Sequence, residues 1–191
     1  MTDGLLIIDK PVGWTSHDVV ARVRRIMREK RVGHTGTLDP FATGVLVVLV
    51  GRATRLAQFL AGAEKEYEAT IRLGYATETG DLTGAPRASG RSVKDCAALE
   101  ESDIEAALSS LRGDIEQVPP MYSAKKIAGR KLYELARRGE SVERKSVRVN
   151  VREFAFMPDE GATTTLRRND DGTCDVRARV VCSAGTYVRV L

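Results

Sequence analysis

Twelve residues near the start of the chain hold the side chains best suited to chemistry. The stretch Gly33–Gly44 reads GHTGTLDPFATG and offers one imidazole, His34, and one carboxylate, Asp39. Glycine permits positive φ, while Pro40 fixes its own φ and keeps the residue before it out of the α region. The stretch therefore predicts a constrained loop. Asp39 in it either makes a local turn bond or presents an ionised carboxylate to a ligand.

Regular elements are predicted on both sides of this loop. The pattern from Ser16 to Lys30 predicts a helix, in which Thr15 and Asp18 have the spacing of a capping box. The run Val45–Val50 is apolar throughout, which predicts a strand covered on both faces. The shorter apolar run Gly4–Ile8 also predicts a buried strand.

The second half of the chain alternates mainly as strands do. Residues Lys65–Leu73 alternate with Tyr67 on the inward face, and valines and phenylalanines between 147 and 156 give a long strand pattern. Asn169–Gly172 is a hairpin turn signal, and Val176–Cys182 alternate on the returning strand. These patterns predict an α+β fold, with a mixed, largely antiparallel sheet flanked by helices.

Two further helices and a linker are predicted between these strands. Ser102 and Glu105 have capping-box spacing, which predicts a helix to Leu111 with Gly113 after its end. Residues 129–138 predict another helix, closed by Gly139. Residues 89–100 have the composition of a surface linker.

Composition excludes several classes of protein. Hydrophobic residues make up 42% and charged residues 29% of the 191 residues, as in soluble globular proteins. The longest apolar run is about six residues, against the ~20 that a membrane-spanning helix needs. The first residues do not resemble a signal peptide, so we expect a cytoplasmic protein. Three cysteines without Cys-x-x-Cys spacing predict neither a disulfide scaffold nor a zinc site.

Positive charge is concentrated in two segments. Residues 10–31 carry seven Lys or Arg against two acids, and residues 122–152 carry ten against three, while the rest of the chain is net acidic. Such clustering favours a face that binds a polyanion, although two solvated helix faces would give the same pattern.

The loop sequence GHTGTLDPFATG resembles the catalytic signature of the TruB family, the tRNA pseudouridine-55 synthases. The resemblance implies that Asp39 is the essential aspartate of catalysis and that His34 lies on the RNA side of the loop. Lys10-Pro11, followed by Gly and Ser, resembles the family's first motif, which packs against the catalytic loop. Lys-x-Tyr-x-Ala at the start of the 65–73 strand resembles the second, whose tyrosine, here Tyr67, stacks on the target base.

Later segments resemble the family in the same order. Residues 74–84 resemble its Gly-x-x-Thr-x-Thr-x-Asp-x-x-Gly segment, with Asp81 as a second site carboxylate or a turn residue. The segment PPMYSAKK, with Lys125 and Lys126, implies a region that lies against tRNA. The C-terminal Gly-Thr-Tyr-Val-Arg resembles the third motif. It implies that Arg189 pairs with Asp39 and that Tyr187 positions Tyr67 or the base.

Isomerising uridine breaks an N–C glycosidic bond, turns the uracil and rejoins it through carbon, so we expect no cofactor. No nucleotide-binding or metal-binding motif is found in the sequence. An ionised Asp39 below the sugar could attack C1′ or act as a base at C2′, and both routes remain open. The Tyr67 hydroxyl is a candidate for removing the C5 proton late in the reaction.

The resemblance covers essentially the whole chain, but family members continue beyond Leu191. We therefore expect residues 1–191 to form a pseudouridine synthase catalytic domain that is incomplete at its C-terminus and lacks the PUA domain. The expected partner is tRNA, through its T-arm, with no membrane and no obligate protein partner. Two alternatives remain, a non-catalytic RNA-binding module and the catalytic subunit of a guide-RNA-directed synthase. The 89–120 insertion and PPMYSAKK look more like the stand-alone bacterial type.

Overall fold

A computed structural model describes residues 2–87, 96, 98–127, 129–157 and 166–191. The chain divides into two compact units, residues 1–63 and 64–191, each of which is described by itself. Most of the predicted linker, residues 89–100, lies outside the described residues.

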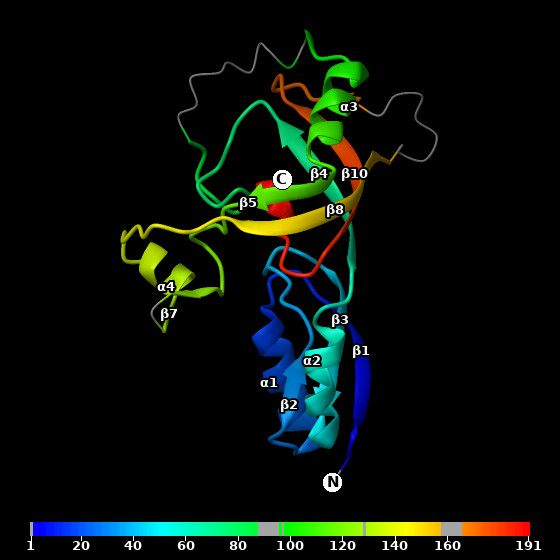
Figure 1. Ribbon diagram of the computed structural model, residues 1–191, viewed down its shortest axis with the longest axis vertical. Coiled ribbons are helices and arrows are strands. Elements are labelled where there is room, and N and C mark those ends of the chain that lie inside the picture. The colour runs from blue at the N-terminus through cyan, green and yellow to red at the C-terminus, as the bar shows by residue number, and fades with distance from the viewer. Residues whose placement is uncertain (1, 88–95, 97, 128, 158–165) are drawn as a thin grey trace. The chain divides into compact units, whose positions relative to one another are not determined.

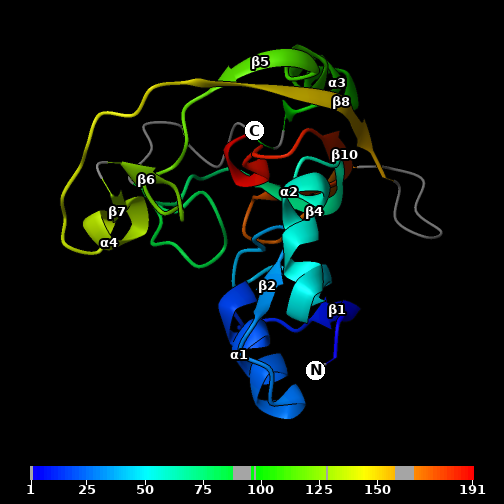
Figure 2. The same cartoon turned by 60° about the horizontal axis from the view of Figure 1, so that its bottom comes forward.

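The first unit is a three-stranded antiparallel sheet with one long helix. Strand β3 (Gly44–Val50) lies between β1 (Gly4–Lys10) and β2 (Val32–His34). Helix α1 (Ser16–Met27) lies alongside β2 in both views (Figures 1 and 2). A 3-10 helix, η1 (Gly51–Leu56), and the short helix α2 (Ala57–Leu60) complete the unit.

The register of this sheet brings two connections to the same end. Lys10, the last residue of β1, pairs with Gly44, the first residue of β3. The start of the turn that follows β1 therefore lies beside the end of the loop that precedes β3. Helix α1 starts at the end of that turn, with the predicted capping box between Thr15 and Asp18 present in both directions.

The core of the first unit is built from valines and leucines of α1 and the sheet. Burial of β1 and β3 differs from the sequence prediction, because both strands expose side chains on one face. Leu5 and Ile7 are 46% and 62% exposed, and Val45 is 70% exposed, whereas Leu46 and Val48 are buried. The prediction of a buried strand is therefore wrong for β1, and that of a strand covered on both faces is wrong for the start of β3.

The second unit contains a five-stranded antiparallel sheet. Its order is β4 (Lys65–Leu73), β10 (Cys174–Cys182), β8 (Val147–Phe156) and β5 (Gly113–Gln117), and β9 (Leu166–Arg168) pairs with β10. The predicted hairpin turn at residues 169–172 connects β9 to β10. Val176, Ala178, Val180 and Cys182 are all buried, which confirms the alternation predicted for this strand.

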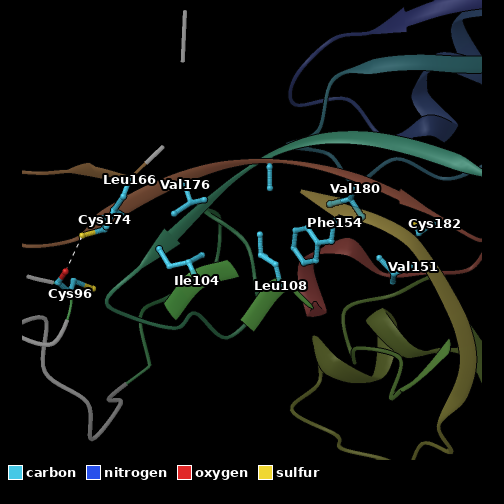
Figure 3. Packing of buried hydrophobic residues seen from close by; sticks show 11 residues of the cluster. Cys96, Ile104, Leu108, Val151, Phe154, Leu166, Cys174, Val176, Val180 and Cys182 are labelled. Atoms are coloured by element: carbon cyan, nitrogen blue, oxygen red, sulfur yellow. Dashed lines mark hydrogen bonds between the residues drawn. The ribbon is translucent and has the colours of Figure 1, made fainter. Parts of the chain in front are cut away.

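One face of this sheet carries the core, and the other carries charge. Ile104 and Leu108 of α3 (Glu101–Ser110) lie against Val176, Val180 and Phe154 (Figure 3). On the opposite face, ion pairs join neighbouring strands, for example Arg72 to Asp175 at 2.7 Å and Arg179 to Glu66 at 2.7 Å. Cross-strand pairs of opposite charge stabilise an antiparallel ladder.

Two predicted helices of this unit have different bounds in the structure. The N-cap of α3 is Glu100, which forms a capping box with Asp103, so the predicted Ser102–Glu105 box is wrong. Residues Lys126–Ile127 and Arg130–Lys131 form a small hairpin, β6–β7, and α4 begins only afterwards, at Leu132, and ends at Ala136. The hairpin and α4 stand off from the sheet between β5 and β8 (Figures 1 and 2).

Antiparallel sheets with flanking helices confirm the predicted α+β class, and every strand pair in the described residues is antiparallel. Within the described residues, no helix has the length and apolar character needed to cross a membrane.

The one-sided burial of β3 can be tested with adjacent residues. Leu46→Ala should lower the free energy of unfolding by about 2–5 kcal/mol, because it leaves a cavity in the core. Val45→Ala should cost less than about 1 kcal/mol, because its side chain is exposed and only strand propensity changes. Denaturant titration of both variants measures the difference, and equal costs would contradict the burial pattern.

Candidate functional site

The loop that carries Asp39 is held by the turn before α1 and by the first residue of that helix. Leu38, directly before Asp39, donates its N–H to Ser16 Oγ at 3.0 Å, and the same hydroxyl lies 3.4 Å from the Leu38 carbonyl. Pro40, directly after Asp39, accepts the N–H of Gly13 at 2.8 Å. The main chain on both sides of Asp39 is therefore fixed, while the Asp39 side chain is half-buried.

Lys10 contributes to the same arrangement from inside the unit. Its side chain is fully buried, and its ammonium donates to the carbonyl oxygens of Trp14 at 2.7 Å, Pro11 at 3.0 Å and Pro40 at 3.4 Å. Burial lowers the pKa of Lys10, and the negative charge of Asp39 acts in the opposite direction. Lys10 thus ties the turn after β1 to the loop that carries Asp39, and a role of Lys10 in binding substrate stays a prediction.

Ser16 was missed by the sequence analysis. It is the first residue of α1 and only 2% exposed, although it follows an N-cap that faces solvent. The sequence signal available was the serine after Gly13 in the first motif, but its contact with Leu38 joins residues 22 positions apart. A local pattern does not reveal such a contact.

His34 is the last residue of β2, so the constrained loop begins at Thr35, two residues later than predicted. Its ring is half-buried and meets the edge of the His17 ring at 6.1 Å. Burial lowers the pKa of His34, against the effect of a hydrogen bond with the backbone of Gly36. The imidazole is therefore neutral at pH 7, and its position toward RNA stays a prediction.

In the second unit, the Arg189 side chain is buried between two other segments of the chain, residues 79–81 and Tyr122. Its Nη1 donates to the Thr79 carbonyl at 3.2 Å and to Asp81 Oδ2 at 3.3 Å, and its Nη2 donates to the Tyr122 carbonyl. Both charged side chains are at least nine-tenths buried. Separating the two side chains would leave an uncompensated buried charge, which is costly. The pair is therefore held in one geometry.

The loop from Gly74 to Pro86 is shaped around Asp81. Thr79 Oγ1 donates to Asp81 Oδ1 at 2.8 Å, and both the N–H and the hydroxyl of Thr83 donate to the same oxygen, at 2.9 and 2.5 Å. Burial alone would raise the pKa of Asp81, but hydrogen bonds from Thr83 and Thr79 and the charge of Arg189 hold it below its ordinary value. Asp81 therefore orders the turn, as one of the two sequence interpretations has it, and pairs with Arg189, while its role as a second site carboxylate stays a prediction.

Gly80 allows this loop to approach Arg189 closely. Its φ is +74°, and a Cβ atom there would lie 2.9 Å from the Arg189 carbonyl oxygen. A side chain at this position would be strained and would also press on the main chain of Arg189.

The two tyrosines of the predicted site are placed by the same unit. Tyr67 on β4 is half-buried, pairs in register with Val180 and packs against the core. Tyr187 is the N-cap of η3 (Val188–Val190), which carries Arg189. Asp39 belongs to the first unit and Tyr67 and Arg189 to the second, so the predicted pairing of Asp39 with Arg189 stays a prediction.

Basic side chains form a surface in each unit. Along α1, two adjoining shallow hollows of about 560 and 570 Å³ share Ala21 and Arg25. They are lined further by Gly13, Trp14, Asp18, Arg22, Arg24, Arg28, Glu29 and Lys30. In the second unit, the β6–β7 hairpin carries Lys126 on its exposed side. Next to it, the Lys131 ammonium and the Arg137 guanidinium each lie 5.4 Å from the centre of the Tyr133 ring.

Comparison with known sequences identifies the family. The family described as "TruB family pseudouridylate synthase (N terminal domain)" matches residues 24–188. The chain belongs to the TruB family. Among curated relatives, the tRNA pseudouridine synthase B of Thermobifida fusca is 53% identical over 194 residues, covering 100% of this chain and 62% of the relative. That of Bacillus subtilis is 44% identical over 191 residues, covering 100% of this chain and 59% of the relative.

Solved structures agree with this membership. A Cbf5–Nop10–Gar1 complex matches with a TM-score of 0.64 and 30% identity, over 98% of this chain and 41% of the matched chain. An H/ACA RNP bound to a substrate RNA containing 2′-deoxyuridine matches with a TM-score of 0.60 and 26% identity, over 98% of this chain and 40% of the matched chain. The present chain spans about 60% of the length of the two curated relatives named above.

The Asp81–Arg189 pair gives a pH dependence with a definite sign. Because the pKa of Asp81 is lowered by folding, its ionised form stabilises the protein above the ordinary value of 3.8. That stabilisation is lost as pH falls through the lowered value. Asp81→Asn should therefore be less stable than the parent at pH 7, and the difference should shrink below about pH 4. Denaturant titrations between pH 7 and 2.5 measure it, and a difference that is constant with pH would contradict the lowered pKa.

Proposed function

We propose that this protein isomerises uridine to pseudouridine at position 55, in the T-arm of tRNA. The observation that carries the proposal is Asp39, whose main chain is held on both sides by buried groups within a TruB-family loop. The relatives named tRNA pseudouridine synthase B support the substrate class.

The reaction exchanges one bond of the nucleoside for another. The N1–C1′ bond breaks, the uracil turns, a C5–C1′ bond forms, and the proton at C5 moves to N1, so no electrons are gained or lost. An ionised carboxylate below the sugar ring provides what either route needs: a nucleophile at C1′ or a base at C2′. We assign this role to Asp39.

Arg189 is the charge that we propose keeps Asp39 ionised during the reaction. A guanidinium near a carboxylate lowers the pKa of that carboxylate even when burial would raise it. The Thr79 and Tyr122 carbonyls and Asp81 fix the guanidinium in one orientation. Asp81 would thus act on the chemistry through Arg189, rather than by binding the substrate directly.

Tyr67 and Tyr187 are proposed to act on the base. An aromatic ring stacked on uracil gains about 0.5–1.5 kcal/mol beyond the area that it buries. Tyr67 would hold the detached uracil in this way, and its hydroxyl is the candidate for moving the C5 proton. Tyr187 would position Tyr67 or the base.

Both basic surfaces fit the backbone of RNA. The hollows along α1 combine arginines with the partly exposed indole of Trp14, and the β6–β7 hairpin and α4 combine lysines and arginines with Tyr133. Interleaved cations and aromatic rings bind phosphates and stack on unpaired bases. The target uridine must leave its stack before any side chain reaches it, which requires such contacts around it. The proposed location is the cytoplasm.

Guide-RNA-directed synthesis is the alternative left open by the sequence. The matched chains of the Cbf5–Nop10–Gar1 complex and of the H/ACA RNP are 30% and 26% identical to this chain, whereas relatives named tRNA pseudouridine synthase B are 44–53% identical. The higher identity favours the tRNA reading, and an assay without guide RNA separates the two.

The catalytic role of Asp39 is tested by Asp39→Asn. The purified variant should bind unmodified tRNA with a Kd within about twofold of the parent, because the amide keeps the shape of the side chain. Pseudouridine formation should fall by more than about 10³-fold, because the negative charge is lost. Asp170→Asn, which changes an exposed aspartate of the β9–β10 connection, is the matched control and should retain activity. Equal loss of binding and turnover in Asp39→Asn would indicate a structural loop or a non-catalytic RNA-binding module.

The RNA surface of the β6–β7 hairpin is tested by charge reversal. The double variant Lys125→Glu/Lys126→Glu should weaken tRNA binding and lower the slope of log K against log salt by roughly 2, one for each lost phosphate contact. Arg167→Glu, an exposed residue of β9, serves as the control for a change of overall charge. Binding measured by filter retention at several salt concentrations gives the slopes, and an unchanged slope would remove the hairpin from the interface.

A further inference from the structure

Gln117 makes an unusual pair of hydrogen bonds with the segment that carries the site arginine. It is the last residue of β5 and only 4% exposed. Its Nε2 donates to the Tyr187 carbonyl at 3.0 Å, and its Oε1 accepts the Tyr187 N–H at 2.8 Å. One side-chain amide therefore pairs with both main-chain polar groups of a residue 70 positions away, as a neighbouring strand would.

Tyr187 lies where regular pairing has ended. Strand β10 stops at Cys182, and η3 begins only at Val188 with no side-chain cap from Tyr187 itself. A half-buried N–H and carbonyl in such a connection need partners, since each unpaired group costs about 1–3 kcal/mol. Gln117 Oε1 is the acceptor for the Tyr187 N–H, and Gln117 Nε2 is a second donor to the Tyr187 carbonyl, which also accepts the Val190 N–H at 3.0 Å.

The position of Tyr187 also sets the position of Arg189. The two residues are joined by a single intervening residue, and the Arg189 guanidinium is held at its far end by Asp81 and by the Thr79 and Tyr122 carbonyls. Gln117 holds the near end, at the main chain. With both ends fixed, the guanidinium has one orientation.

We propose that Gln117 is a positioning residue for the isomerisation. It fixes the main chain of Tyr187 so that the side chains of Tyr187 and Arg189 are held in place for the reaction, and it does not touch the substrate itself. This inference rests on the proposed function. Misplacement of reacting groups by about 1 Å lowers rates by about 10²-fold, so loss of this contact should act on the rate rather than on RNA affinity.

The chemistry of the amide makes the inference specific. A glutamine side chain donates with nitrogen and accepts with oxygen, as this contact requires, whereas an ionised glutamate only accepts and would repel the Tyr187 carbonyl. A protonated glutamate again has one donor and one acceptor. Burial raises the pKa of a carboxyl group, so a glutamate at this position should become protonated above its usual pKa of about 4.3.

The experiment uses the purified protein and three variants. Gln117→Met keeps the length and removes both hydrogen bonds, and Gln117→Glu restores them only when protonated. Thr173→Val removes a buried hydroxyl that binds Asp171 at the start of β10, and so destabilises the same unit at a different position. Single-turnover pseudouridine formation, tRNA affinity and amide hydrogen exchange of the 185–191 peptide are measured for each, from pH 8 to pH 5.

The inference predicts a rate loss of about 10- to 100-fold in Gln117→Met at saturating tRNA, with the Kd within about twofold of the parent. The 185–191 peptide should exchange faster, while β10 peptides should not change. The rate of Gln117→Glu is divided by the parent rate at the same pH. This ratio should equal that of the methionine variant at pH 8 and should rise toward 1 as the pH falls.

Three results would overturn the inference: a methionine variant within twofold of the parent rate, an unchanged exchange of the 185–191 peptide, or the same rate loss in Thr173→Val at equal loss of stability. A parent protein that forms no pseudouridine would instead refute the proposed function. Hydrogen exchange in Gln117→Met then decides by itself whether the amide holds Tyr187.

Discussion

The structure of the first unit depends on how the main chain around Asp39 satisfies its polar groups. The loop between β2 and β3 has few regular partners, yet its main chain is partly buried. Peptide N–H and carbonyl groups in that situation need hydrogen bonds from elsewhere in the protein. Ser16, Gly13 and Lys10 provide them at Leu38 and Pro40. The residue between these two contact points is Asp39, to which we assign the carboxylate of the proposed reaction.

The second unit uses buried polar groups in the same way. Arg189 is surrounded by carbonyl oxygens and Asp81, and Asp81 is in turn bound by the hydroxyls of two threonines. Burying two charges is costly unless both are paired and hydrogen-bonded, so each contact in the set depends on the others. The result is a cation with a fixed direction, which a flexible surface arginine would not provide.

Local patterns predicted the elements well, because their signals lie within a few residues. The capping box of α1, the alternation of β10 and the hairpin before it were all confirmed. Errors arose where burial depends on the rest of the fold. The exposed face of β1 could not be deduced from residues nearby. The cap of α3 is a local feature, but the Glu100–Asp103 box competes with the Ser102–Glu105 spacing only two residues along the chain. The resemblance to the TruB family supplied the site residues, and the family itself was confirmed.

The contacts that hold the candidate site residues could not be predicted from the sequence. Ser16 contacts a residue 22 positions away, Gln117 one that is 70 away, and Asp81 one that is 108 away. Serine, glutamine and aspartate are common at turns and surfaces, so their types alone gave no reason to place them in the interior. Only the register of the sheets and the path of the connections bring these pairs together.

The complete burial of Lys10 makes this lysine a natural reporter of loop motion. Reagents that acylate amines react quickly with exposed lysines, but the Lys10 nitrogen is covered and engaged by three carbonyl oxygens. Such a reagent reaches it only when the turn and the catalytic loop separate. The labelling rate of this one amine therefore counts openings of the loop, and the free energy of opening follows from its ratio to the rate of a free lysine.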